Sequence, residues 1–267
     1  FRRPEKNGET QSSLFHPPTT ILTSNLNRNK MLDSILSRLP APGKEFRGAP
    51  FWAWNGKLEP QELRRQINDF REMGFGGFFM HSRVGLNTEY LGREWFECVR
   101  ACIDEAKKCG MDAWLYDEIG WPSGFGGGEV NASGDEFRQK FLRFRTVRRE
   151  ECAVEQVAGL YSPDGSRYLG SDPSELPAGE ILEITYEVNP FYVDVLNPAV
   201  TEKFLAVTHQ RYFDTLGAGL CRRIKGIFTD EPQVVIGRPV WSPTLNAAYR
   251  RRYGRELTPE LPMLRLD

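Results

Sequence analysis

Apolar runs of strand length recur along the chain from about residue 46 onward. Three of them are "APFWAW" (residues 49–54), "GFGGFFMHSR" (74–83) and "MDAWLYDE" (111–118). Each run is too short for a typical helix and is rich in aromatic or branched residues, which favours a buried strand. These runs therefore predict three successive strands.

Amphipathic segments separate these runs. Residues 59–73 and 93–109 carry apolar residues at helical spacing; Pro60 stands in the first turn of the former, and Gly110 follows the latter as a C-cap. Strands that alternate with helices of this length indicate a parallel α/β fold.

The alternation stops between residues 137 and 189. The segments there read as antiparallel strands around a Pro-Asp-Gly turn: "KFLRFRTVRRE", "GLYSPDGSRYLG" and "EILEITYEV". Beyond them we expect a fourth parallel strand, "FYVDVLNP", a helix over residues 199–216, a fifth strand, "IKGIFTDEP", and a helix that starts near Ser242.

Polar residues gather at the C-terminal ends of these strands. Catalytic groups supplied by several successive strand ends are typical of a (β/α)8 TIM-type barrel, whereas a doubly wound sheet binds ligands at one switch point. The sequence thus predicts a barrel truncated after about five βα units. Its expected parts are a poorly ordered tail (1–45), barrel units 1–3 (46–136), an inserted antiparallel β subdomain (137–189) and barrel units 4–5 (190–267).

Composition narrows the partners and the compartment. The net charge of −1 gives no reason to expect nucleic acid, and no apolar stretch is long enough to predict a membrane span. Five cysteines without CxxC spacing suggest neither a disulfide framework nor a thiolate zinc site. No signal peptide is visible, so we expect a cytoplasmic protein, with Met31 as a hypothetical natural start.

Two adjacent carboxylate pairs are the strongest chemical signal. Asp117-Glu118 and Asp230-Glu231 each follow an apolar strand. Neighbouring strand residues point to opposite faces, so one member of each pair can aim into a site, and alternation does not say which. Glycoside hydrolysis needs two such carboxyl groups across a cleft. We assign catalysis to the glutamates, and to the aspartates substrate binding, orientation or the binding of a metal ion. The competing interpretation is ordinary salt bridges or helix caps.

Further residues near the strand ends fit a sugar. Trp54 and Trp121 offer flat apolar faces, and Asn55, His81 and Arg83 offer hydrogen-bonding groups. The glycine run at residues 124–128 lacks the Lys-Ser/Thr of a phosphate-binding loop, so a flexible lid or a close backbone approach is the better interpretation.

These segments, in their order along the chain, resemble a known family. "FRGAPFWAWNGKLEPQELRRQI", "GFGGFFMHSRVGLNTEYL", "AWLYDEIGWPSGFGGG", "VDVLNP" and "IKGIFTDEP" are similar to glycosyl hydrolases around glycoside hydrolase family 106, the α-L-rhamnosidase family. The resemblance runs from about Phe46 to Tyr253. It implies a (β/α)8 catalytic domain, inversion at the anomeric carbon, a glutamate pair and, for some members, an active-site calcium ion. Glu118 then corresponds to the general acid and Glu231 to the general base.

The chain departs from that family in length. Family members continue through the remaining barrel units and into β-domains, which we expect to be missing here. The leading hypothesis is a glycoside hydrolase acting on an oligosaccharide or glycoside, an α-L-rhamnoside or a related glycan. The first alternative is a carbohydrate-binding fragment without catalysis. The second is a metal-dependent hydrolase, which is weaker because the three histidines lack HxH and HExxH spacing. A calcium site with oxygen ligands stays open. The sequence names neither the sugar nor the oligomeric state.

Overall fold

The computed structural model describes residues 30–37, 39–234 and 237–265. The chain divides into two compact units, residues 1–46 and 47–267. The expectation of a natural start at Met31 concerns mostly residues outside the described ones. In the first unit, residues 30–36 form a short helical segment and η1 spans Lys44–Phe46.

The second unit contains a parallel sheet with the order β1-β2-β3-β8. Its strands are β1 (Phe51–Gly56), β2 (Gly77–Leu86), β3 (Asp112–Tyr116) and β8 (Ile224–Phe228). The two predicted helices are present as α2 (Pro60–Glu72) and α3 (Arg93–Cys109). Gly110 ends α3 in the left-handed region, with φ 66°, as a C-cap glycine does. The parallel α/β prediction therefore holds for this layer.

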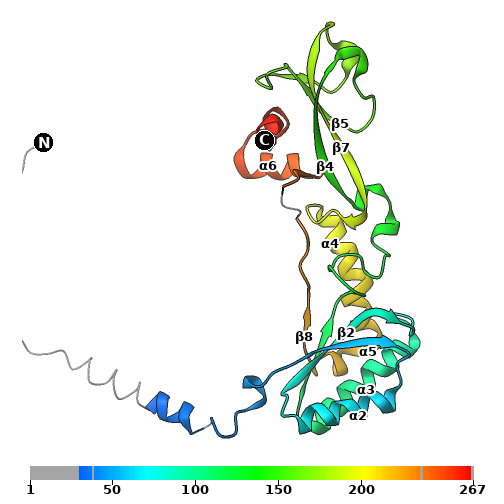
Figure 1. Cartoon of the computed structure of the whole chain (residues 1–267), viewed down its shortest axis with the longest axis vertical. Coiled ribbons are helices and arrows are strands. Elements are labelled where there is room, and N and C mark those ends of the chain that lie inside the picture. The colour runs from blue at the N-terminus through cyan, green and yellow to red at the C-terminus, as the bar shows by residue number, and fades with distance from the viewer. Residues whose placement is uncertain (1–29, 38, 235–236, 266–267) are drawn as a thin grey trace, which may run out of the picture. The chain divides into compact units, whose positions relative to one another are not determined.

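Helices cover one face of the parallel sheet (Figure 1). Leu63 and Ile67 of α2, most of the apolar face of α3, and Tyr212 and Leu216 of α5 (Arg211–Cys221) form one core with the strands. Alternation along each strand sends every second side chain into this core, which buries Trp52 and Trp54 of β1. The side chains between them face away from the helices.

The predicted antiparallel sheet is also present, with the order β6-β5-β7-β4-β9. Its strands are β4 (Arg138–Arg148), β5 (Val157–Tyr161), β6 (Tyr168–Gly170), β7 (Glu180–Val193) and β9 (Val240–Trp241). A second core joins this sheet to α6 (Leu245–Tyr253) and to η7 (Thr258–Leu264). Short 3-10 turns complete the unit: η2 (Asn131–Ser133), η3 (Asp135–Phe137), η4 (Arg149–Glu151) and η5 (Pro173–Glu175).

The expected fourth parallel strand, "FYVDVLNP", is wrong. Residues 191–193 are the end of β7, which pairs antiparallel with β4. The dipeptide Asn189-Pro190 resembles a turn signal, yet β7 continues through it. The register of β4 and β7 shifts between Arg138 and Gln139, and this irregularity accommodates Pro190, which has no N–H to donate to the ladder. The chain then enters α4 (Pro198–Leu205), whose N-cap Asn197 accepts a hydrogen bond from the Ala199 amide.

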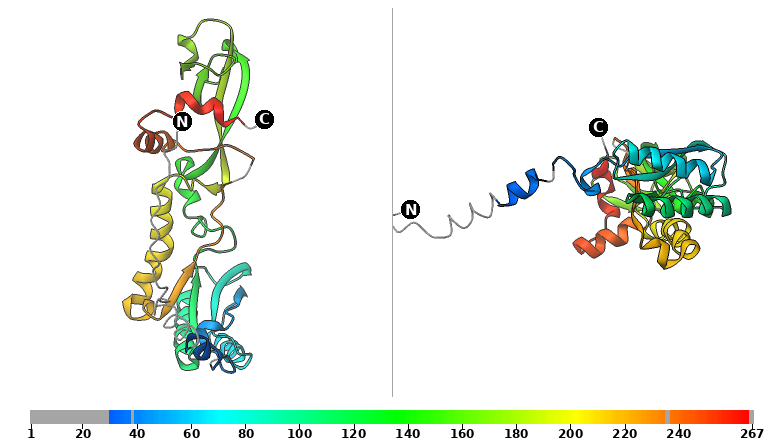
Figure 2. Two further views of the ribbon diagram at one scale, coloured as in Figure 1. Left: turned by 90° about the vertical axis from the view of Figure 1, so that its left-hand side faces the viewer. Right: turned by 90° about the horizontal axis from the view of Figure 1, so that it is seen from below.

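The parallel sheet consequently has four strands among the described residues, and β1 and β8 form its edges. β8 pairs directly with β3 and so occupies the position beside β3 that was expected for the fourth strand, "FYVDVLNP". The described residues do not show the truncated barrel of the sequence prediction; their fold is a mixed α/β arrangement with one parallel and one antiparallel sheet. Before β8, α4, the π-helical turn η6 (Ala206–Gln210) and the first part of α5 form one helical stretch (Figure 2), which is kinked at Gly217 with φ 76°.

Candidate functional site

The first carboxylate pair lies at the C-terminal end of β3 and is completely buried. Asp117 accepts two hydroxyl hydrogen bonds, from Ser123 Oγ to Oδ1 at 2.5 Å and from Thr229 Oγ1 to Oδ2 at 2.6 Å. Burial raises the pKa of Asp117, and these two hydrogen bonds oppose the rise. Asp117 therefore joins the loop after β3 to the loop after β8.

Glu118 has different surroundings. Its carboxylate accepts backbone N–H bonds from Ile119 (2.9 Å), Gly124 (3.3 Å), Gly126 (2.8 Å) and Gly127 (2.8 Å). Burial raises the pKa of Glu118, while the N–H donors pull it down. The glycine run thus forms an anion-binding nest that is filled by a side chain of the same loop.

The glycines of this loop are required by close packing. Gly126 has φ +58°, and a Cβ there would lie 2.4 Å from Val207 Cγ2; at Gly124 a Cβ would lie 2.8 Å from Val193 Cγ2. Any larger residue must displace a neighbouring side chain. Of the two interpretations of the run, the close backbone approach is the one that the structure shows.

The second carboxylate pair follows β8. Tyr116 donates its hydroxyl to Asp230 Oδ2 at 2.8 Å. Ser123 fixes the Asp230 backbone from both sides: its amide donates to the Asp230 carbonyl (2.8 Å), and its hydroxyl accepts from the Asp230 amide (2.9 Å). Glu231 is exposed and has φ +42°, in the left-handed region that non-glycine residues seldom adopt. The two pairs are thus connected through Ser123, Thr229 and Tyr116.

A cavity of about 420 Å³ opens on the sheet face that lacks helices. Its lining residues come from β1, β2 and β8 and the ends of these strands: Phe51, Ala53, His81, Arg83, Phe228 and Asp230. Phe51 stacks on Phe79 with 4.8 Å between ring centroids and meets Phe228 edge-on at 4.9 Å. The site therefore combines aromatic faces with a cation, a carboxylate and an imidazole.

His81 is the polar group of this cavity with an unused bonding position. Its side chain is 7% exposed, and Nε2 makes no hydrogen bond within the described part of the chain. Burial and the charge of Arg83 lower the pKa of His81 to about 4, so its imidazole is neutral at pH 7. A buried polar nitrogen without a partner is costly unless a ligand or water supplies one.

The structure distributes the sequence-predicted residues unevenly. His81, Arg83 and Asp230 line one cavity. Trp54 is 1% exposed in the helix-covered core, against Trp52 and Trp95, so it does not reach this cavity. Asn55 and Trp121 are exposed and line neither this cavity nor the pocket between α4 and the loop after β8. Asp117, Glu118 and Glu231 lie at the same edge of the sheet, in the two connected loops.

Sequence reasoning missed the residues that connect the acids. Ser123, within "WPSGFGGG", and Thr229, within "FTDE", both donate hydrogen bonds to the Asp117 carboxylate, and Tyr116 donates one to Asp230. Hydroxyl residues beside a buried carboxylate are the available signal, because such a group needs hydrogen-bond donors. No periodicity would have revealed these contacts, since the two loops are more than 100 positions apart in sequence.

The described residues contain no cluster of three or more His, Cys, Asp or Glu side chains suited to a metal ion. In the same portion of the chain, every helix is too short or too polar to cross a membrane.

Comparisons with known proteins find similarity at the level of the fold. No family model matches the chain, and no curated protein matches it. The structure of the rhamnosidase from Novosphingobium sp. PP1Y is similar, with a TM-score of 0.58 and 12% sequence identity, over 85% of this chain and 42% of that chain. At this identity the likeness shows a shared fold, and the chain spans less than half the length of that enzyme.

Proposed function

We propose that the chain is part of a glycoside hydrolase that binds its sugar at the C-terminal edge of the parallel sheet. The observation that carries this proposal is the cavity whose polar groups, His81, Arg83 and Asp230, lie toward the C-terminal ends of β2 and β8. The fold likeness to a rhamnosidase and the resemblance of the motifs to glycoside hydrolase family 106 support it. The substrate would be an α-L-rhamnoside or a related glycan, and the four-stranded sheet would be part of a (β/α)8 barrel.

The groups of the cavity suit a sugar ring. Phe51 and Phe228 present aromatic surface to the apolar side of a ring. Arg83 donates hydrogen bonds, Asp230 accepts them, and the unpartnered Nε2 of His81 meets a hydroxyl group. The hydrogen bond from Tyr116 holds the Asp230 carboxylate in place for this role.

In the proposed reaction, two carboxyl groups act on opposite sides of the anomeric carbon. Glu231, which is exposed, is the proposed general base that activates water, and Glu118, whose pKa is raised by burial, is the proposed general acid. Inversion requires room for that water between them. Glu118 meets a substrate only when the N–H groups of residues 119–127 release its carboxylate, so this mechanism includes movement of the loop.

The enclosure of Glu118 also favours a second candidate function. Four backbone donors occupy its carboxylate and hold the glycine loop over it. A chain in which this loop never opens would bind a carbohydrate at the His81–Arg83 cavity without cleaving it. The second candidate is therefore a carbohydrate-binding fragment.

A screen of aryl glycosides, beginning with 4-nitrophenyl α-L-rhamnoside, tests the proposal. The hydrolase predicts release of nitrophenol, with a sugar of inverted anomeric configuration by NMR, and a loss of at least about 100-fold in kcat for Glu231→Gln. Glu180→Gln, which removes an exposed carboxylate at the start of β7, should retain full activity. Binding of the glycoside without release of nitrophenol supports the second candidate. If the chain neither binds nor cleaves the glycoside, both candidates are refuted.

A further inference from the structure

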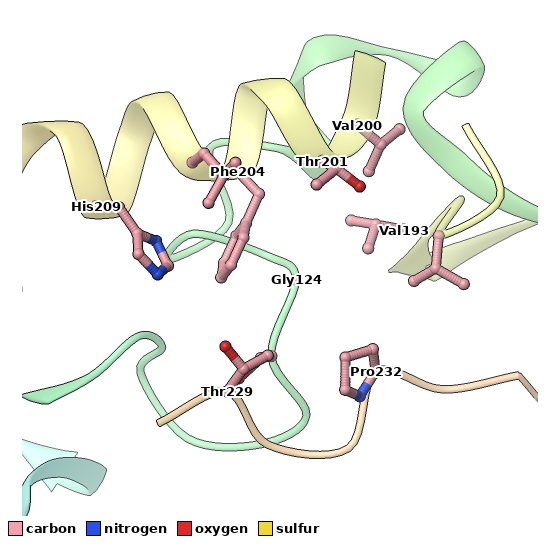
Figure 3. Close-up of a pocket in the computed structure, with 11 residues that line it drawn as sticks. Gly124, Val193, Val200, Thr201, Phe204, His209, Thr229 and Pro232 are labelled. Carbon is pink, nitrogen blue, oxygen red and sulfur yellow. The ribbon is translucent and has the colours of Figure 1, made fainter. Parts of the chain in front are cut away.

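A second pocket lies between the helical stretch after β7 and the loop after β8 (Figure 3). Its volume is about 250 Å³, and it shares no lining residue with the cavity on the sheet face. Phe204 and His209 point into it from the helix, while Thr229 and Pro232 lie opposite them, with Gly124 between (Figure 3). No role assigned above uses this pocket.

The walls of the pocket are mainly apolar. Val193, Val200, Phe204, Leu205 and Pro232 line it without any hydrogen-bonding side-chain group. Apolar cavities of about 150 Å³ already accept benzene, so this one has room for a six-membered ring with a substituent. A sugar carries hydroxyl groups around its whole ring and would leave most of them unpaired here. The walls therefore favour a flat apolar body over a saccharide.

The π-helical turn η6 places the main polar group in this pocket. A π turn brings residues five apart onto the same side of the helix, and the rings of Phe204 and His209 lie 5.9 Å apart, edge to face. Such turns occur frequently at functional sites. η6 thus sets an imidazole beside the aromatic wall.

The protonation of His209 follows from its neighbour. Thr208 donates its single hydroxyl proton to the Phe204 carbonyl at 2.6 Å, so in its 2.9 Å contact with His209 Nδ1 it must accept. Nδ1 therefore carries a proton. Burial lowers the pKa of His209, which keeps the ring neutral at pH 7 and leaves Nε2 as a hydrogen-bond acceptor.

Thr201 and Thr229 add hydroxyl groups to the lining, and that of Thr229 is an acceptor. Thr229 spends its hydroxyl proton on Asp117 Oδ2, so only the lone pairs of its oxygen are available to the pocket. No Lys or Arg lines the pocket in the described residues, and the buried carboxyl group of Asp117 lies behind Thr229. An anion is disfavoured there, and a neutral ligand that donates a proton is favoured.

We propose that this pocket binds a small neutral alcohol with a flat apolar body, of the phenol class, which donates its O–H to His209 Nε2 or Thr229 Oγ1. The apolar walls hold the ring, and the two acceptors select the hydroxyl group. This binding does not depend on sugar hydrolysis. The pocket would thus hold an aromatic group at the edge of the sheet, beside the loop that contains Asp117.

Titration of the full chain with 4-fluorophenol, followed by ¹⁹F NMR at pH 7, tests the proposal. The fluorophenol should show saturable binding, and 4-fluoroanisole, which lacks the O–H donor, should bind about five- to tenfold more weakly. Absence of saturable binding, or equal affinity for the two probes, overturns the proposal.

A pair of variants locates the binding. Leu205 is 44% exposed at the rim, so Leu205→Trp can place an indole across the pocket with little cost to the core. Its neighbour Ala206 is exposed and does not line the pocket, which makes Ala206→Trp the matched control. Leu205→Trp should weaken fluorophenol binding at least about tenfold, and Ala206→Trp should leave it unchanged. Equal effects of the two variants would place the ligand elsewhere and overturn the assignment. Circular dichroism confirms that both variants fold.

Discussion

At the scale of single residues, Asp117 and Glu118 are adjacent and equally buried but bonded to different kinds of donor. Asp117 binds two side-chain hydroxyl groups, which can rotate, whereas Glu118 binds backbone N–H groups, which cannot. A neutral amide can therefore replace Asp117 more easily than Glu118. The difference makes Asp117 the better position for testing the cost of a buried charge.

Asp117→Asn should change how stability depends on pH. Because burial raises the folded-state pKa of Asp117 above its ordinary value of 3.8, its contribution is fully present below that value and is lost as pH rises through the raised pKa. Asparagine does not titrate. Urea unfolding at pH values from 4 to 7 should therefore show the variant gaining stability relative to the wild type as pH increases. A difference that stays constant or shrinks would contradict the role of burial.

The residue scale also shows what the sequence could predict. The two carboxylate pairs were found because each follows an apolar run, and the structure connects them through Ser123 and Thr229. The orientation of Glu118 could not be predicted, because it depends on the left-handed backbone of several glycines six to nine positions later. Trp54 was expected at the ligand because it stands at a strand end, but strand alternation turns it into the helix-covered core.

At the scale of elements, the loop between β3 and η2 holds the site together. Glu118 fills its N–H nest from the inside, and Val193 and Val207 pack against its glycines from the outside. Both interactions require the backbone to approach closely. An alanine substitution at one glycine can separate two effects: the clash of an added Cβ with a neighbouring side chain, and the backbone strain of a positive φ.

Gly126→Ala should destabilise the protein more than Gly110→Ala. Both glycines have similar positive φ values, 58° and 66°, so alanine meets comparable backbone strain at each. A Cβ at Gly126 would lie 2.4 Å from Val207 Cγ2, while nothing lies within 4 Å of one at Gly110. Gly126→Ala should therefore lower the free energy of unfolding by about 1–3 kcal/mol more, measured by urea denaturation. Equal losses would show that the loop has room for the methyl group.

Element boundaries show where sequence patterns mislead. The ends of α2 and α3 agree with their proline and glycine signals, because local chemistry sets them. The segment "FYVDVLNP" was expected to resume the parallel alternation, but β4 keeps β7 extended through Asn189-Pro190 to Val193. Long-range strand pairing of this kind overrides the local preference of Asn-Pro for a turn.

At the scale of the whole molecule, the parallel sheet leaves its aromatic face without helices. Phe51, Phe79 and Trp114 stack along this face, and Phe228 meets Phe51 edge-on. The polar groups of His81, Arg83 and Asp230 lie at the C-terminal edge. In the proposed (β/α)8 barrel the aromatic side chains would belong to the packed interior, and the polar groups at the C-terminal edge would face the ligand. The central claim is therefore that this cavity is a carbohydrate site.

Calorimetric titration of the chain with methyl α-L-rhamnoside tests that claim most directly. Arg83 is exposed, so Arg83→Ala removes a donor of the cavity without opening the core. The control Arg251→Ala removes another exposed arginine, on α6. The account predicts saturable binding by the wild type and by Arg251→Ala, and binding about tenfold weaker or more by Arg83→Ala. No binding by the wild type, or unchanged binding by Arg83→Ala, would contradict it.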